Sequence, residues 1–202
     1  MSTHVNSLLC LGDSYTIGEG LPLYESFPYQ LMQLLRRQHV HLHAPELVAK
    51  TGWTSFELAD YLINHVLQEK YDFVTLLIGV NNQYRGLEVA DYAEEFEFLL
   101  KKAIHLAAGK PEHVLVLSIP DWTVTPFAAK AGRQAEAAII DQYNDANRLL
   151  SAKYGTAYID ITPDTRQAAD DLSLLAADEL HPSGKAYARW AAEAAAWVKS
   201  CL

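Results

Sequence analysis

Five short apolar runs, each followed by a segment in which apolar residues recur at helical spacing, constrain the fold of this chain most strongly. Nearly continuous apolar runs are typical of parallel strands that are buried on both faces. We expect strands over residues 5–11, 46–50, 72–78, 113–119 and 157–161. Apolar residues three to four positions apart predict helices over residues 26–38, 54–66, 91–108, 134–154 and 183–199.

Strands that alternate with helices predict a parallel sheet with helices on both faces. The expected fold is therefore α/β, a three-layer α/β/α sandwich with a five-stranded parallel sheet of flavodoxin-like topology. The chain has 202 residues and no composition shift or Gly/Ser-rich linker. We therefore expect a single domain over residues 1–202.

Composition excludes several classes of partner. The formal net charge of −9 disfavours binding to nucleic acid or to an anionic membrane. No apolar run approaches the roughly 18 residues that span a bilayer, so we expect no stable membrane insertion. The sequence as given begins without a basic segment or a long apolar region, and the two cysteines, Cys10 and Cys201, suggest no disulfide framework. We expect a cytoplasmic protein. Its oligomeric state is not indicated.

Polar residues of a particular kind follow the predicted strands. The first strand ends in a tight turn that carries Ser14, Gly52 follows the second strand, and Asn81 follows the third. Asp178 and His181 lie beyond the fifth. In open parallel sheets, sites form outside the carboxyl ends of the strands, so we expect these residues to share one edge of the sheet.

The residue types fit one reaction. A serine hydroxyl needs a base to become a nucleophile, and the base needs an orienting group, so we assign His181 and Asp178 to these tasks. The backbone N–H groups of Ser14 and Gly52 and the side-chain amide of Asn81 can form an oxyanion hole. Each residue has a structural alternative, namely a cap, a turn residue or a surface loop residue. Their joint placement on one edge favours catalysis.

Four segments also resemble, in the same order along the chain, the four sequence blocks of the SGNH (GDSL-type) hydrolase superfamily. They are Gly12-Asp13-Ser14, Gly52, Gly79-Val80-Asn81 and Asp178-Glu179-Leu180-His181-Pro182. The resemblance covers nearly the whole chain. It implies an α/β/α sandwich of the SGNH hydrolase type and a serine esterase, lipase or acyl-transfer activity that needs no metal or cofactor.

The resemblance also implies roles for residues and has two departures. It implies Ser14 as the nucleophile, His181 as the base and Asp178 as its partner, with Ser14, Gly52 and Asn81 in the oxyanion hole. Tyr15 stands where a leucine is frequent, which changes little. Asn82 stands where an aspartate commonly follows Asn81, and we expect this neutral residue to alter the support of the hole or the substrate preference.

The predicted function is hydrolysis of a small-molecule carboxylic ester through an acyl-enzyme, with short-chain or acetyl esters favoured because few long apolar loops are present. An acyltransferase or thioesterase with the same residues is the nearest alternative. A non-catalytic binding protein on the same fold is an alternative from another class. An aspartate-dependent phosphohydrolase at Asp13 would need further carboxylates, of which Asp160 is the only obvious one.

Aromatic residues near the predicted site have two interpretations. Tyr15, Trp53, Tyr84 and Arg85 are candidate substrate contacts, and the predicted loop over residues 121–133, which holds Trp122 and Phe127, can shape the mouth of a pocket. At least half of these aromatic side chains are equally explained by packing in the core.

Three histidines, His39, His41 and His43, alternate with apolar residues and share one face of an extended segment. No carboxylate or cysteine completes a ligand set nearby, so we expect a solvated face and no metal site.

Overall fold

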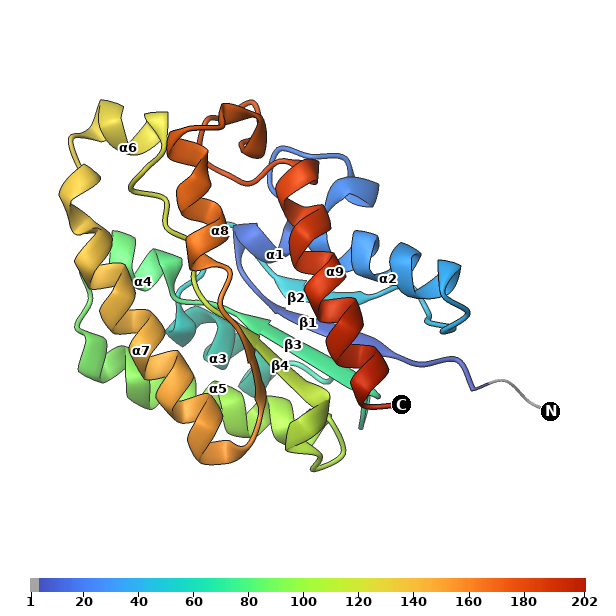
Figure 1. Ribbon diagram of the computed structural model, residues 1–202. Coiled ribbons are helices and arrows are strands. Elements are labelled where there is room, and N and C mark those ends of the chain that lie inside the picture. Colours follow the sequence, from blue (N-terminus) through green and yellow to red (C-terminus); the bar gives the residue numbers. More distant parts are fainter. Residues whose placement is uncertain (1–3) are drawn as a thin grey trace.

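The computed structural model, which describes residues 4–202, is a three-layer α/β/α sandwich around a parallel sheet (Figure 1). The strand order is β2-β1-β3-β4-β5, and every neighbouring pair is parallel. This is the predicted flavodoxin-like order. The strands are β1 (Leu8–Gly12), β2 (Glu46–Ala49), β3 (Phe73–Leu77), β4 (Val114–Leu117) and β5 (Ala157–Ile159).

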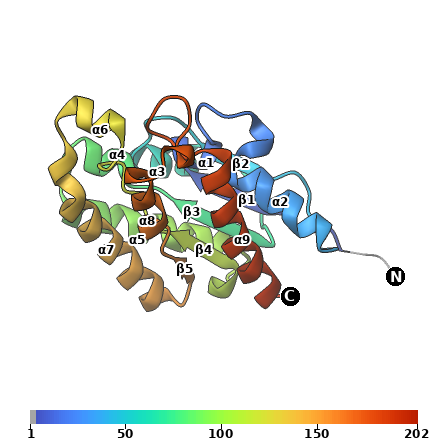
Figure 2. The ribbon, with the colours of Figure 1, turned by 45° about the horizontal axis from the view of Figure 1, so that its top comes forward.

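Five longer helices cover the two faces of the sheet (Figure 2). On one face α2 (Phe27–Arg37) packs against α9 (Gly184–Ser200), and on the other α5 (Val89–Leu106) packs against both α3 (Ser55–Asn64) and α7 (Ala137–Tyr154). These are the five predicted helices. A capping box closes the start of α3, because Thr54 accepts from the Glu57 N–H while the Glu57 carboxylate accepts from the Thr54 N–H.

Short helical segments fill much of what remains. They are α1 (Ser14–Ile17), η1 (Leu23–Glu25), α4 (Val80–Tyr84), η2 (Pro111–His113), α6 (Pro126–Ala131), η3 (Gln134–Glu136), α8 (Thr162–Arg166), η4 (Gln167–Ala169) and η5 (Leu172–Leu174). The prediction of a loop over residues 121–133 is therefore wrong in its second half, where α6 lies. Thr125 caps α6 by accepting from the Ala128 N–H, and Pro126 occupies the first turn, where a proline is tolerated. Six residues are too few to show a helical period.

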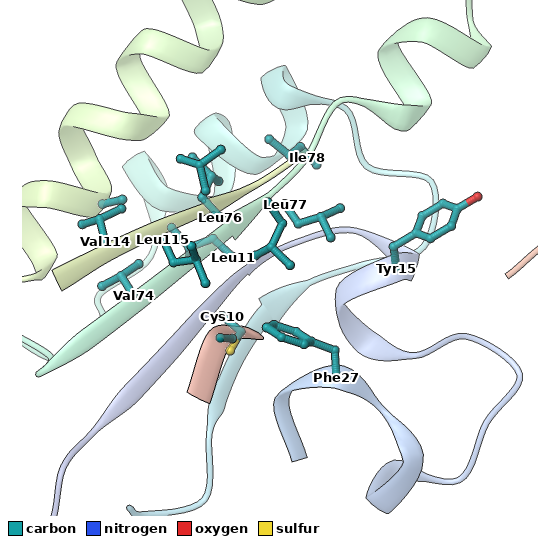
Figure 3. Packing of buried hydrophobic residues seen from close by; sticks show 14 of the residues in the cluster. Cys10, Leu11, Tyr15, Phe27, Val74, Leu76, Leu77, Ile78, Val114 and Leu115 are labelled. Carbon is teal, nitrogen blue, oxygen red and sulfur yellow. The ribbon is translucent and has the colours of Figure 1, made fainter. Parts of the chain in front are cut away.

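The central strands form the core (Figure 3). Every residue of β1 and β3 is buried, and Leu11 and Leu76 are fully so. A Cβ atom added at Gly12 would lie 2.0 Å from Thr16 Oγ1 and 2.4 Å from the Leu77 carbonyl oxygen. Only glycine fits where β1 passes this close to its neighbours, and the chain turns from there into α1.

Two further predictions concern the three histidines and membrane insertion. His39, His41 and His43 are exposed, as predicted for a solvated face. Within residues 4–202, no helix combines the length and the apolar composition that crossing a bilayer requires.

Candidate active site

Ser14 is the first residue of α1, directly beyond the carboxyl end of β1. The preceding Asp13 caps this helix, because its Oδ1 accepts from the Tyr15 N–H at 3.0 Å. Burial raises the pKa of the Asp13 carboxyl to about 7, although hydrogen bonds from the Tyr15 N–H and the Asn81 side chain act in the opposite direction. Asp13 therefore holds the turn in which Ser14 is presented.

His181 and Asp178 lie on one tight turn before α9. Asp178 Oδ1 accepts from the N–H groups of Leu180 and His181, each at 3.0 Å, and its Oδ2 lies 2.6 Å from His181 Nδ1. Burial acts to raise the pKa of Asp178, but these hydrogen bonds outweigh it and the net pKa is lowered. The carboxyl is therefore ionised and accepts from the imidazole.

The imidazole joins this turn to Ser14. His181 Nε2 lies 3.0 Å from Ser14 Oγ, and the His181 side chain is mostly buried. An ionised Asp178 accepts from Nδ1–H, so the lone pair on Nε2 faces the serine hydroxyl. This arrangement can take the proton from Ser14 as the oxygen attacks.

Hydrogen-bond donors surround Ser14. Among the hydrogen bonds of residues 4–202, neither the Ser14 nor the Gly52 backbone N–H has an acceptor. The Asn81 amide donates to the Trp53 carbonyl at 3.0 Å and to Asp13 Oδ2 at 3.3 Å, a long and therefore weak contact. Arg85 Nη2 donates to the Gly52 carbonyl at 2.5 Å. The φ of Gly52 is +83°, a conformation that favours glycine.

Asn82, at the position of the departure from the family pattern, is fully buried and tied to the start of α3. Its Oδ1 accepts from the Ser55 N–H at 2.9 Å, and its Nδ2 donates to Ser55 Oγ at 2.6 Å. The Ser55 hydroxyl in turn donates to Glu95. This network links α3, α4 and α5 directly behind Asn81.

A cavity of about 200 Å³ adjoins Ser14. It is lined by Ser14, Tyr15, Val80, Asn81, Tyr84, Trp122, Phe127, Leu180 and His181. Tyr84 is 42% exposed, so the cavity opens to solvent along this side chain. Its walls are mainly apolar, so they suit an apolar acyl chain better than a charged group.

Two of the four predicted substrate contacts, Tyr15 and Tyr84, line this cavity, and the other two do not. Trp53 packs against Tyr61, with ring centroids 5.2 Å apart, and Arg85 pairs with Glu57.

Two further findings concern residues beyond this cavity. Asp160, the carboxylate that a phosphohydrolase at Asp13 would need, lines a different cavity and accepts from Ser118 Oγ. Sequence reasoning missed Gln83, Arg133 and Glu136, which hold the aromatic wall from outside. Their only sequence signal is the three-residue spacing of Arg133 and Glu136, which is common in helices.

A five-stranded parallel sheet between two helical layers, with these side chains at its carboxyl edge, is the fold of the SGNH hydrolases. The chain belongs to the GDSL-like lipase/acylhydrolase family, whose model matches residues 10–189. No match to the chain was found among curated protein sequences.

Solved structures show the same fold at low sequence identity. A lipase/acylhydrolase from Enterococcus faecalis has a TM-score of 0.76 and 21% identity, covering 98% of this chain and 97% of that one. The psychrotrophic esterase EstA from Pseudoalteromonas sp. has a TM-score of 0.71 and 20% identity, covering 96% and 97%. Axe2, an acetylxylan esterase from Geobacillus stearothermophilus, has a TM-score of 0.73 and 17% identity, covering 96% of each chain.

Proposed function

We propose that the protein hydrolyses carboxylic esters with short acyl chains through an acyl-enzyme on Ser14. The observation that carries this proposal is the chain of contacts from Ser14 Oγ to His181 Nε2, at 3.0 Å, and from His181 Nδ1 to Asp178, at 2.6 Å. Serine esterases require this order of nucleophile, base and orienting carboxylate.

In the first half of the reaction Ser14 Oγ attacks the acyl carbonyl carbon, and its proton passes to His181 Nε2. The carbonyl oxygen becomes an oxyanion, which accepts from the N–H groups of Ser14 and Gly52 and from the Asn81 amide. When the intermediate collapses, the bond to the alcohol breaks and the leaving oxygen takes the proton from His181.

In the second half a water molecule replaces the alcohol. Its oxygen attacks the acyl-enzyme carbonyl while His181 takes one of its protons. Collapse of the second intermediate releases the carboxylic acid and returns the proton to Ser14 Oγ. Asp178 stays ionised throughout and stabilises the imidazolium that forms in each half.

Asn81 has to change one partner during this cycle. Its amide hydrogens face Trp53 and Asp13, and the contact to Asp13 is the longer of the two at 3.3 Å. We infer that the oxyanion replaces Asp13 as acceptor while the bond to the Trp53 carbonyl keeps the amide in position.

Short acyl chains are favoured by the size of the cavity. A cavity of about 150 Å³ is enough for benzene, and the about 200 Å³ here must hold the acyl group together with the near part of the alcohol. The likeness to an acetylxylan esterase is consistent with a small acyl group.

The test compares the protein with its Ser14→Ala variant. A fluorophosphonate probe should label the protein at Ser14, nitrophenyl acetate should be hydrolysed, and the variant should show neither reaction while unfolding at the same temperature. A Ser173→Ala variant, which alters an exposed serine, should behave as the unsubstituted protein. Labelling of Ser14→Ala at the full rate contradicts the proposal. Added alcohol or thiol acceptors separate hydrolysis from acyl transfer by the products formed.

A further inference from the structure

Trp122, which lines the cavity beside Ser14, is held by a closed ring of interactions. Its Nε1 donates to Gln83 Oε1 at 2.7 Å, and Gln83 Nε2 donates to Glu136 Oε2 at 2.8 Å. Glu136 accepts two hydrogen bonds from Arg133, at 2.6 and 2.7 Å. The Arg133 guanidinium closes the ring, because its Cζ lies 4.9 Å from the centroid of Trp122 and 4.4 Å from that of Tyr84.

We call Gln83, Arg133 and Glu136 the clamp. None of the three lines the cavity, whereas both aromatic rings that they hold do. Hydrogen bonds from Arg133 lower the pKa of the Glu136 carboxyl, so it remains ionised and accepts from both of its clamp partners. Charge-assisted, bidentate pairs of this kind fix geometry more strongly than single neutral hydrogen bonds.

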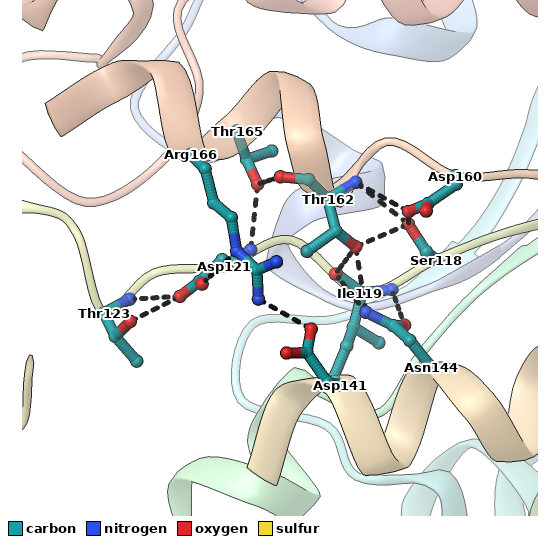
Figure 4. Close-up of polar contacts among 10 residues, drawn as sticks. All are labelled: Ser118, Ile119, Asp121, Thr123, Asp141, Asn144, Asp160, Thr162, Thr165 and Arg166. Carbon is teal, nitrogen blue, oxygen red and sulfur yellow. Dashed lines mark hydrogen bonds and ion pairs between the residues drawn. The ribbon is translucent and has the colours of Figure 1, made fainter. Parts of the chain in front are cut away.

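The backbone that carries Trp122 is fixed independently (Figure 4). The neighbouring Asp121 is buried, and its Oδ1 accepts from the N–H and the hydroxyl of Thr123. Its Oδ2 accepts from Arg166 Nε at 2.8 Å, and its N–H donates to Thr165. With the main chain held in this way, the clamp determines how far the indole of Trp122 can move.

A second, smaller void lies next to the cavity, and three residues line both. It has a volume of about 20 Å³, and Tyr15, Trp122 and Leu180 line both spaces. A space of this size holds a water molecule or a methyl group and no more. Its remaining walls include the apolar side chains of Leu174 and Leu175, so movement of Trp122 would extend the cavity into apolar surroundings.

We propose that the clamp limits the length of the acyl chain by holding Trp122 and Tyr84 as a rigid wall of the acyl pocket. This inference rests on the proposed ester hydrolysis at Ser14. With the wall in place, the pocket of about 200 Å³ accepts short acyl chains in preference to long ones. Without the clamp, Trp122 moves and longer chains enter.

The test is a series of nitrophenyl esters from acetate to octanoate with two clamp variants. Arg133→Met keeps the aliphatic part of the side chain but removes the guanidinium, and Gln83→Leu removes the two side-chain hydrogen bonds of Gln83. Each should raise the ratio of kcat/KM for octanoate to that for acetate by about tenfold, the effect of a few methylene groups gaining access to an apolar pocket. Arg148→Met is the matched control, since Arg148 pairs with Asp145 three residues away and touches neither ring.

A double variant provides a second test, because a mere loss of stability would not make the effects of the two substitutions non-additive. Because both residues act through one ring, the Gln83→Leu/Arg133→Met double variant should raise the ratio no further than the larger single effect. If both single variants fold and keep the octanoate-to-acetate ratio of the unsubstituted protein, the proposed role of the clamp is wrong. If the unsubstituted protein hydrolyses none of the esters and takes up no fluorophosphonate, the proposed function fails first, which is distinguishable from failure of the clamp alone.

Discussion

Asn82 and Ser55 are joined by two hydrogen bonds that run in opposite directions. The Ser55 N–H donates to Asn82 Oδ1, and Asn82 Nδ2 donates to Ser55 Oγ. Because the Ser55 oxygen accepts from the amide, its own proton is available for Glu95, to which it donates. An aspartate at position 82, which is common in the family pattern, would need that same proton. The neutral Asn82 and the carboxylate of Glu95 are therefore matched to one another.

This match predicts a reciprocal rescue. Asn82→Asp should lower the free energy of unfolding by about 3 kcal/mol, since one of two carboxylates then faces the serine oxygen without a proton. Adding Glu95→Gln should restore most of the loss, because the amide introduced at position 95 can donate to Ser55 while Ser55 donates to the carboxylate introduced at position 82. Glu95→Gln alone is the control, and its effect should be small. Urea unfolding measures all three, and equal losses in the single and double aspartate variants would contradict the match.

Asn81 should contribute to the rate of the reaction more than to binding. Asn81→Ala removes a donor that we place at the oxyanion, and loss of one such donor typically lowers kcat by about 10² to 10³. KM should change much less, because the donor acts on charge that develops after binding. Asn64→Ala, on the exposed side of α3, is the matched control and should leave kcat unchanged. A fall in kcat of less than about fivefold for Asn81→Ala would remove Asn81 from the hole.

Asp178→Asn tests the orienting role of the carboxylate. The amide can still accept from the N–H groups of Leu180 and His181, so the turn should keep its shape. Its NH₂ group, however, can face His181 Nδ1, which favours the tautomer that carries the proton on Nε2 and leaves no base for Ser14. A fall in kcat of up to about 10⁴ is expected.

The control for this experiment is Asp171→Asn. Asp171 caps a neighbouring turn in the same manner, since its Oδ1 accepts from the Ser173 N–H at 3.0 Å, and its side chain is 44% exposed. Its replacement should leave kcat near the original value. Retention of more than a tenth of the activity in Asp178→Asn would exclude Asp178 as the orienting residue.

Much of the fold could be predicted because its signals are local. Strands buried on both faces have continuous apolar runs, and the helices show their period over ten or more residues. The rule that carboxyl ends of parallel strands meet at one edge was enough to expect Ser14, Asn81 and His181 near one another, and the structure brings them together. These inferences need the order of elements but no detail of packing.

The clamp and the cavity walls could not be predicted in this way. Gln83 and Glu136 are 53 positions apart, and their contact depends on how α4 lies relative to η3, directly before α7. Trp53 follows the second strand in a position that suits a substrate contact, yet its ring packs against Tyr61. The direction of such side chains depends on their rotamers and on how the short helices pack. Neither produces a periodic pattern in the sequence.

Asp13 should make the stability of the protein fall as the pH rises. Burial raises the pKa of this carboxyl from 3.8 to about 7 in the folded state. A group whose pKa is raised by folding stabilises the folded state fully below its unfolded pKa, and this contribution is lost as the pH rises through the folded pKa. Between about pH 4 and pH 7 the loss amounts to at most about 4 kcal/mol.

The Asp13→Asn variant isolates this contribution, because an amide does not titrate. The free energy of unfolding of the variant minus that of the unsubstituted protein should increase from pH 4 to pH 8 in urea titrations. Asp178→Asn provides a control whose effect has the opposite sign and appears only below about pH 4, so its titrations extend to lower pH. Hydrogen bonds hold the pKa of Asp178 below 3.8, so its stabilising contribution is present above that pH and is lost as the pH falls further. A difference for Asp13→Asn that is flat across this range would show that Asp13 is ionised throughout, with its charge balanced by the N–H of Tyr15 and the amide of Asn81.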